Sequence, residues 1–138
     1  MPEGLPLFKP PYSRMTAINM NTGEHAWMIP TGNGDRIRNS PRLQPLKLGP
    51  VGGDVTYSGP LLTKTILVYA LTTGGTTGGP RLVAYDKANG KELGSVDLPG
   101  SAIGTPMTYL AGGKQFIALT VSGRSQQDIP ELVAFSLP

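Results

Sequence analysis

The sequence predicts an all-β fold, a partial β-propeller of about two and a half four-stranded antiparallel blades. Three observations lead to this prediction. A short pattern recurs along the 138 residues, once in full, once in part and once as its opening strand only. Each of the first two copies has the alternation and tight turn of a β-hairpin. Two more strand signals precede the second and third copies, so the repeating unit has about four strands rather than the strand and helix of a leucine-rich repeat.

The recurring pattern can be followed residue by residue. The first copy, Ala-Ile-Asn-Met-Asn-Thr-Gly-Glu-His-Ala-Trp, starts at residue 17, and the second, Ala-Tyr-Asp-Lys-Ala-Asn-Gly-Lys-Glu-Leu-Gly, starts at residue 84. The third copy, at 131–138, contains only the first strand of the pattern. We expect the glycines to make the turns and the tryptophan to stack between blades. The positions that define the repeat are Ala17, Thr22, Gly23, Trp27, Ala84, Asp86 and Gly90.

The expected strands follow in chain order. Residues 14–20 and 25–29 form the outer two strands of one blade. A complete blade has strands at 59–63, 64–71, 81–86 and 91–98, and a last blade has three, at 104–109, 114–121 and 131–137. Because a propeller needs at least about four blades, we expect the chain to be the C-terminal portion of a larger protein. The prediction is one partial propeller domain over 1–138, divided into 1–29, an insertion loop at 30–58, a complete blade at 59–98 and a three-stranded blade at 99–138.

The repeat resembles a known motif. Ala-x-Asp-x-x-Thr-Gly-x-x-x-Trp is the tryptophan-docking repeat of the quinoprotein dehydrogenases, eight-bladed propellers that use pyrroloquinoline quinone (PQQ). The first copy departs from it at Asn19, and the second at Asn89 and Gly94. Other phrases resemble the end of the membrane-linked glucose dehydrogenase branch: Gly-Leu-Pro-Leu-Phe-Lys-Pro-Pro-Tyr from residue 4, Asp-Arg-Ile-Arg-Asn from residue 35 and Gly-Thr-Pro-Met-Thr-Tyr from residue 104.

The resemblance implies a C-terminal fragment of a PQQ-dependent sugar or alcohol dehydrogenase, in which hydride moves from the substrate's hydroxyl carbon to the quinone. It implies PQQ and calcium as cofactors of the parent enzyme and a periplasmic location, with the export signal outside this chain. The calcium ligands and the catalytic aspartate of the family lie in earlier blades, so no catalytic or metal residue is assigned here and we expect the chain alone to be inactive. The alternative is a propeller used only as a binding or assembly scaffold.

A basic segment lies in the insertion loop. Arg36, Arg38, Arg42 and Lys47 have only Asp35 as a nearby acid. Two interpretations remain open, a solvated loop and a set of donors facing the central funnel, where the three carboxylates of PQQ need paired cations. Loop aspartates, including Asp54, are expected to be turn or cap residues rather than bases. The candidate cofactor-binding residues are Arg36, Arg38, Asn39 and Arg124.

Composition and charge exclude several classes of function. The formal net charge is +3, and no aromatic residue lies among the basic residues between Pro30 and Val55, so nucleic acid is not an expected partner. The chain has no cysteine, one histidine and no apolar run near the roughly 20 residues of a membrane span. The expected partners are the remaining blades of the parent propeller, or further copies of the chain joined through exposed edges, with a small sugar or alcohol as substrate of the parent.

Overall fold

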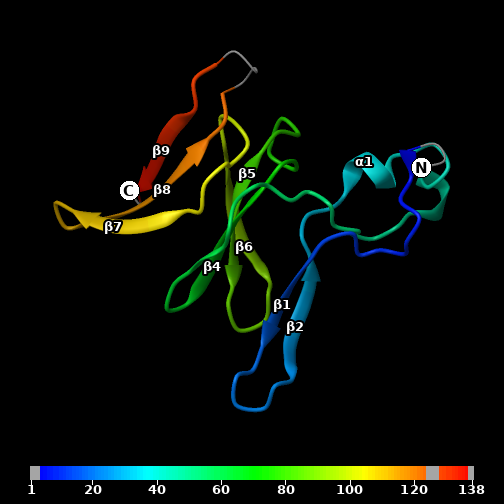
Figure 1. Ribbon diagram of the computed structural model, residues 1–138, viewed down its shortest axis with the longest axis horizontal. Coiled ribbons are helices and arrows are strands. Elements are labelled where there is room, and N and C mark those ends of the chain that lie inside the picture. The colour runs from blue at the N-terminus through cyan, green and yellow to red at the C-terminus, as the bar shows by residue number, and fades with distance from the viewer. Residues whose placement is uncertain (1–3, 124–127, 137–138) are drawn as a thin grey trace. The chain divides into compact units, whose positions relative to one another are not determined.

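The computed structural model describes residues 4–123 and 128–136, and most of its regular secondary structure is antiparallel strand (Figure 1). The predicted all-β fold is confirmed. The chain divides into two compact units, 1–55 and 56–138, each of which is described by itself. The assignment of the whole chain to one propeller domain stays a prediction.

The first unit contains one hairpin and a long loop. The hairpin pairs β1 (Arg14–Ile18) with β2 (His25–Pro30), and the loop carries α1 (Asp35–Arg38) and the 3₁₀ helix η2 (Gln44–Leu46). The sequence predicted only a loop at 30–58, because helices of four and three residues are too short to show a helical period. No helix in the described part of the chain is long and apolar enough to cross a membrane.

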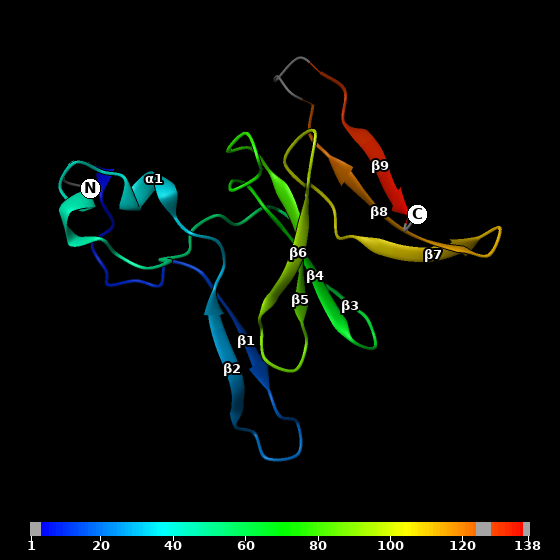
Figure 2. The same cartoon turned by 180° about the vertical axis from the view of Figure 1, so that it is seen from behind.

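The second unit contains two sheets, seen from both sides in Figures 1 and 2. Their strands follow chain order, so each connection joins neighbours in the sheet. Each strand that the sequence predicts has a counterpart, although the first one is reduced to two residues. The four-stranded sheet contains β3 (Leu61–Leu62), β4 (Ile66–Leu71), β5 (Arg81–Asp86) and β6 (Glu92–Asp97), and the three-stranded sheet contains β7 (Met107–Ala111), β8 (Lys114–Val121) and β9 (Glu131–Ser136).

The turn of the β1–β2 hairpin is held by backbone and side-chain acceptors. The backbone N–H of Asn19 donates to Glu24 O at 2.8 Å, and that of Gly23 donates to Asn19 O at 2.7 Å. Asn19 Oδ1 accepts from the N–H of Asn21 at 2.9 Å, and Thr22 Oγ1 accepts from that of Glu24 at 3.3 Å. Gly23 has φ +75°, a conformation that glycine adopts without steric cost.

The turn of the β5–β6 hairpin repeats these four hydrogen bonds. Asp86 N–H donates to Lys91 O and Gly90 N–H to Asp86 O, both at 2.8 Å. Asp86 Oδ1 accepts from Ala88 N–H, and Asn89 Oδ1 accepts from Lys91 N–H, both at 2.8 Å. The side-chain acceptors are thus Asn or Asp at one position and Thr or Asn at the other. Asn19 and Asn89 depart from the tryptophan-docking motif, but each still provides an acceptor oxygen where the turn needs one.

The two hairpins also share the register of their strands. Ala17 lies opposite Trp27 and Ala84 lies opposite Gly94, and in both hairpins the register shifts immediately after the alanine. Trp27 is half-buried. Its stacking between blades stays a prediction, as does the tryptophan-docking repeat as a whole, although the two turns share the same hydrogen bonds.

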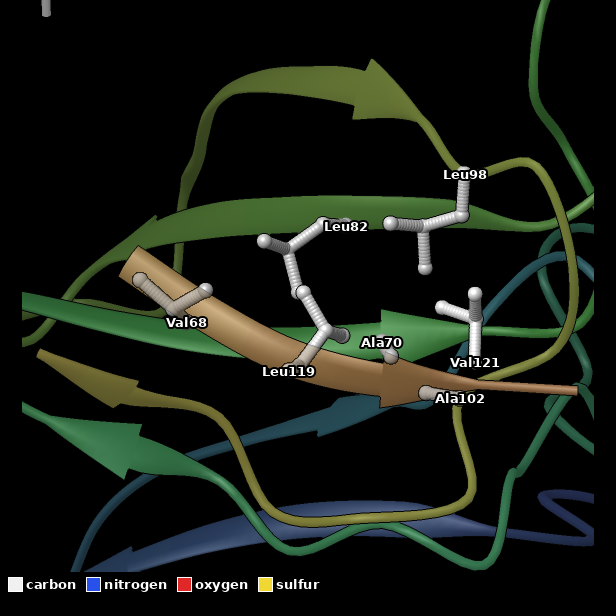
Figure 3. Packing of buried hydrophobic residues seen from close by; sticks show 7 residues of the cluster. All are labelled: Val68, Ala70, Leu82, Leu98, Ala102, Leu119 and Val121. Atoms are coloured by element: carbon white, nitrogen blue, oxygen red, sulfur yellow. The ribbon is translucent and has the colours of Figure 1, made fainter. Parts of the chain in front are cut away.

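A hydrophobic core joins the two sheets of the second unit (Figure 3). Leu82 of the first sheet and Leu119 of the second point toward one another and are 5% and 2% exposed. Aliphatic burial of this kind contributes about 25 cal/mol per Å² of apolar surface. The cluster consists of Val68, Ala70, Leu82, Leu98, Ala102, Leu119 and Val121, with Leu61, Ile66, Ile117, Val133 and Phe135 packed against it.

The other side of the four-stranded sheet carries two buried tyrosines. Burial raises the pKa of Tyr69, and it raises the pKa of Tyr85 to about 12, with the negative charge of Glu92 adding to the effect on Tyr85. Both phenols therefore stay neutral well above physiological pH.

We predict that Asp86→Ala lowers the free energy of unfolding by about 1 to 2 kcal/mol, because the turn loses the acceptor for Ala88 N–H and the partner of the Asn89 amide, whose Nδ2 lies 2.9 Å from Asp86 Oδ2. Asp86→Asn keeps an acceptor oxygen, as Asn19 does in the first hairpin, and is expected to cost less than half as much. Urea unfolding followed by circular dichroism measures both variants. Equal losses for the two would contradict the turn argument.

A second prediction concerns alkaline stability. The folded pKa of Tyr85 lies above its unfolded value of about 10, so its stabilising contribution is complete below about pH 10 and is lost as the pH rises through about 12. Between these values the wild-type free energy of unfolding should fall more steeply than that of Tyr85→Phe, by at most about 1.4 kcal/mol per pH unit. Urea titrations at half-unit intervals from pH 9 to 11.5 compare the two. Parallel curves would show that the phenol does not contribute.

Candidate functional site

The loop that follows β2, at 31–54, is closed at its base by hydrogen bonds. Thr31 N–H donates to Ser13 O at 3.1 Å, and the hydroxyls of these two residues are hydrogen-bonded to each other. Gly53 N–H donates to Ser13 Oγ at 2.6 Å, and Asp54 N–H donates to Thr31 O at 3.3 Å. Both ends of the loop therefore meet beside β1, which gives the basic segment a defined position.

Asp54 fastens the start of α1 to the end of the loop. Its side chain is buried, and Oδ2 accepts a hydrogen bond from Gly34 N–H at 2.8 Å. A Cβ on Gly32 would overlap the Asp54 side chain, and one on Gly34, at φ +69°, would overlap the Gly52 carbonyl. Asp54 therefore acts through a long-range hydrogen bond to the residue before α1, rather than as the local turn or cap residue that was expected. Gly32 and Gly34 are required because neighbouring atoms leave no room for a Cβ.

Arg38 has a structural position inside the loop. Nε donates to Leu48 O at 2.9 Å, and Nη1 forms an ion pair with Asp35 Oδ1 at 3.1 Å. Its side chain is 30% exposed, so the guanidinium joins α1 to the returning segment of the loop. Two of its three guanidinium nitrogens are thus engaged within the protein.

Arg36 and Asn39 instead line an open hollow of about 540 Å³. Both are exposed, and buried Ile37 lies between them in the sequence. Within residues 4–123 and 128–136, Arg36 forms no ion pair, whereas the nearby carboxylate of Asp35 is paired with Arg38. The hollow therefore offers one unneutralised cation together with an amide and a hydroxyl. Its lining consists of Gly4, Leu5, Asp35, Arg36, Ile37, Asn39, Ser40 and Pro41.

The structure thus separates the four candidate residues. Arg36 and Asn39 both line the hollow. Arg38 instead donates to the Leu48 carbonyl within the loop, and Arg124 lies outside the described residues. The sequence did not reveal Gly4 and Leu5 as part of this site. No local pattern marks them, because their approach to α1 depends on how the first residues fold back.

A second polar cluster, also missed from the sequence, lies in the second unit. Arg81 Nη1 and Nη2 contact the two carboxylate oxygens of Glu92 at 2.7 and 3.3 Å. Asp97 accepts hydrogen bonds from the hydroxyl and the backbone N–H of Thr76, and these bonds lower the pKa of Asp97. The cluster ties the glycine-rich loop after β4 to β6. Cross-strand geometry brings these groups together, so only the strand register reveals them.

Among the residues that the structure describes, no group of three or more His, Cys, Asp or Glu side chains is arranged to hold a metal ion. The hollow beside α1, with the exposed guanidinium of Arg36 in its lining, is the candidate site.

Residues 1–117 match the family described as "PQQ: Glucose/ethanol/alcohol dehydrogenase, beta-propeller domain". The chain belongs to this family. Its relatives include quinate/shikimate dehydrogenase (quinone) of Acinetobacter baylyi, 36% identical over 128 residues, which are 89% of this chain and 15% of that protein. Quinoprotein glucose dehydrogenase A of Acinetobacter calcoaceticus is 29% identical over 143 residues, 99% of this chain and 17% of that protein.

Solved structures agree on the fold. Quinohemoprotein alcohol dehydrogenase of Comamonas testosteroni superposes with a TM-score of 0.52 at 21% identity, over 78% of this chain and 12% of that one. A quinohemoprotein alcohol dehydrogenase of Pseudomonas putida HK5 gives 0.53 at 18% identity, over 80% and 12%. Family membership confirms the quinoprotein resemblance, and the quinate and glucose dehydrogenase relatives confirm its glucose dehydrogenase-like branch. The chain spans about one sixth of the length of these relatives.

We predict that Asp54→Ala lowers the free energy of unfolding of the first unit by about 2 kcal/mol, because Gly34 N–H loses its buried acceptor. Asp54→Asn keeps an acceptor oxygen and is expected to cost less. The only tryptophan, Trp27, lies in this unit, so its fluorescence during urea unfolding reports the transition. A loss below about 0.5 kcal/mol for the alanine variant would mean that the carboxylate does not hold the loop.

Proposed function

We propose that this chain forms part of the propeller of a PQQ-dependent dehydrogenase that oxidises a hydroxyl-bearing carbon of a sugar, alcohol or related polyol. The observation that carries the proposal is the family match over residues 1–117, in a chain whose hairpins repeat the same turn. The relatives act, by their names, on quinate or shikimate, glucose and glycerol, which all carry secondary hydroxyl groups. PQQ, when bound in such an enzyme, accepts the hydride that leaves the substrate carbon.

The hollow beside α1 suits one part of PQQ. The cofactor is a tricarboxylate, and a carboxylate is bound best by a guanidinium with further donors close by. Arg36 and Asn39 supply these donors, and Arg38, through its contacts with Asp35 and Leu48, holds the turn of chain that presents them. Arg124 remains a further proposed contact outside the described residues. The described residues bring no three carboxylates or histidines together, and we assign no residue of this chain to calcium.

The partners and location follow from the same proposal. We propose that the sheets of this chain pack beside the remaining blades of the parent propeller, or associate through exposed edges such as those of β6 and β9, the edge strands of their sheets. Family membership supports a periplasmic location. The sugar or alcohol would bind to the assembled enzyme.

We predict that the 138-residue chain, supplied with PQQ, calcium and an artificial electron acceptor, does not oxidise glucose, glycerol or quinate. A general base and a metal must be held together for this chemistry, and we assign neither to this chain. Dye reduction measured on the purified protein tests this. Turnover that copurifies with the protein would show that the chain contains a complete active site.

The binding part of the proposal has its own test. Equilibrium dialysis, with PQQ followed by its absorbance, should show weak binding that Arg36→Gln weakens by at least about fivefold. Lys47→Gln is the matched control, since it removes one positive charge from the same loop but does not line the hollow. If both variants weaken binding equally, the effect is one of net charge and not of the hollow. If the wild type does not bind PQQ, the hollow is not a PQQ contact.

A further inference from the structure

Two Asn-Gly dipeptides occur in the chain, Asn33-Gly34 in the loop before α1 and Asn89-Gly90 in the turn between β5 and β6. In such a dipeptide the backbone nitrogen of the glycine can attack the side-chain amide carbon of the asparagine, because glycine has no Cβ to hinder the approach. The attack forms a cyclic succinimide and releases ammonia, and water then opens the ring to aspartate or isoaspartate. The structure gives the two dipeptides opposite surroundings for this reaction.

The Asn89 side chain is held by two hydrogen bonds. Its Nδ2 donates to Asp86 Oδ2 at 2.9 Å, and its Oδ1 accepts from Lys91 N–H at 2.8 Å. The attacking nitrogen, that of Gly90, donates its hydrogen to Asp86 O at 2.8 Å, and a carbonyl oxygen is too weak a base to remove it. The turn therefore protects the Asn89 amide, although this side chain is exposed to water.

The Gly34 nitrogen has a different partner. Its N–H donates to Oδ2 of Asp54 at 2.8 Å, and Asp54 is only 5% exposed. A carboxylate can accept the proton that the nitrogen must lose, and its burial strengthens the hydrogen bond to this proton. In the part of the chain that the structure describes, the Asn33 side chain makes no hydrogen bond. Its amide carbon is therefore not held away from the nitrogen, as that of Asn89 is.

We propose that Asn33 is a site of spontaneous deamidation in which Asp54 acts as the base. Asp54 takes the proton of Gly34 N–H as the nitrogen bonds to the Asn33 amide carbon, and the proton passes to the departing amide nitrogen, which leaves as ammonia. Water then adds to one of the two ring carbonyls and gives aspartate or isoaspartate. The reaction is independent of the dehydrogenase proposal, because its groups all lie in the first unit and water is the only co-reactant.

Peptide mapping by mass spectrometry during incubation at neutral pH follows both dipeptides in the same molecule. We expect Asn33 to deamidate at least about tenfold faster than Asn89, whereas exposure alone predicts the reverse order. In urea the Asp54 contact is lost, so the two rates should come within about threefold of one another. Equal rates in the folded protein would overturn the proposal. So would a difference that persists in urea, because it would come from the neighbouring sequence.

Two variants separate the base from its hydrogen bond. Asp54→Asn keeps an acceptor oxygen for Gly34 N–H but cannot take the proton, so deamidation at Asn33 should slow by at least about tenfold. Asp86→Asn is the matched control, because it makes the same replacement in the other turn and should leave the rate at Asn33 unchanged. A faster reaction at Asn33 in Asp54→Asn would show that the carboxylate protects the loop. An equal effect of the control would trace the change to stability, and either result contradicts the proposal.

The pH dependence provides a readout in the wild-type protein, which does not require a folded variant. Without a base in the protein, succinimide formation draws on hydroxide, so the rate at Asn89 should rise with hydroxide concentration. The rate at Asn33 should change by less than about threefold between about pH 6 and 8, because its base belongs to the protein. Parallel pH profiles at the two asparagines would show that Asp54 does not remove the proton.

Discussion

Burial of aliphatic side chains between successive sheets is the constraint on which this structure depends. The described helices are four and three residues long, so they provide no apolar layer to cover a sheet. The sheets of the second unit must therefore cover one another, and the contacts around Leu82 and Leu119 show how they do so. This contact buries the side of β4 that carries Val68 and Ala70.

The two turns keep the same hydrogen bonds although their residues differ. A carboxylate or an amide oxygen accepts the same backbone hydrogen bond at Asn19 and Asp86, and a hydroxyl or an amide oxygen does so at Thr22 and Asn89. The position of Trp27 differs, since Gly94 replaces it in the second copy and neither residue takes part in the turn. Turn formation therefore does not depend on a tryptophan at this position.

The basic loop contains two kinds of residue: those whose side chains hold the loop together and those whose side chains are exposed beside the hollow. Asp54 and Arg38 are engaged by Gly34, Leu48 and Asp35. That engagement holds α1 in a fixed conformation and leaves Arg36 and Asn39 exposed beside the hollow. In the sequence Arg36 and Arg38 look alike. In the structure Arg38 is bound to Leu48 and Asp35, whereas Arg36 lines the hollow.

The sequence by itself determined the strands, the two hairpin turns and the quinoprotein family, because strand alternation, turn glycines and the spacing of the repeat are local properties of the chain. It also predicted cofactor-binding roles for Arg36, Arg38 and Asn39, with a solvated loop as the alternative, and these roles stay a proposal. Tertiary structure decided that Arg38 is held by the Leu48 carbonyl, that Gly4 and Leu5 join the hollow, and that Arg81 meets Glu92 across two strands. These contacts join residues distant in sequence, and their partners are selected by how the chain folds back and by strand register, which no short pattern encodes.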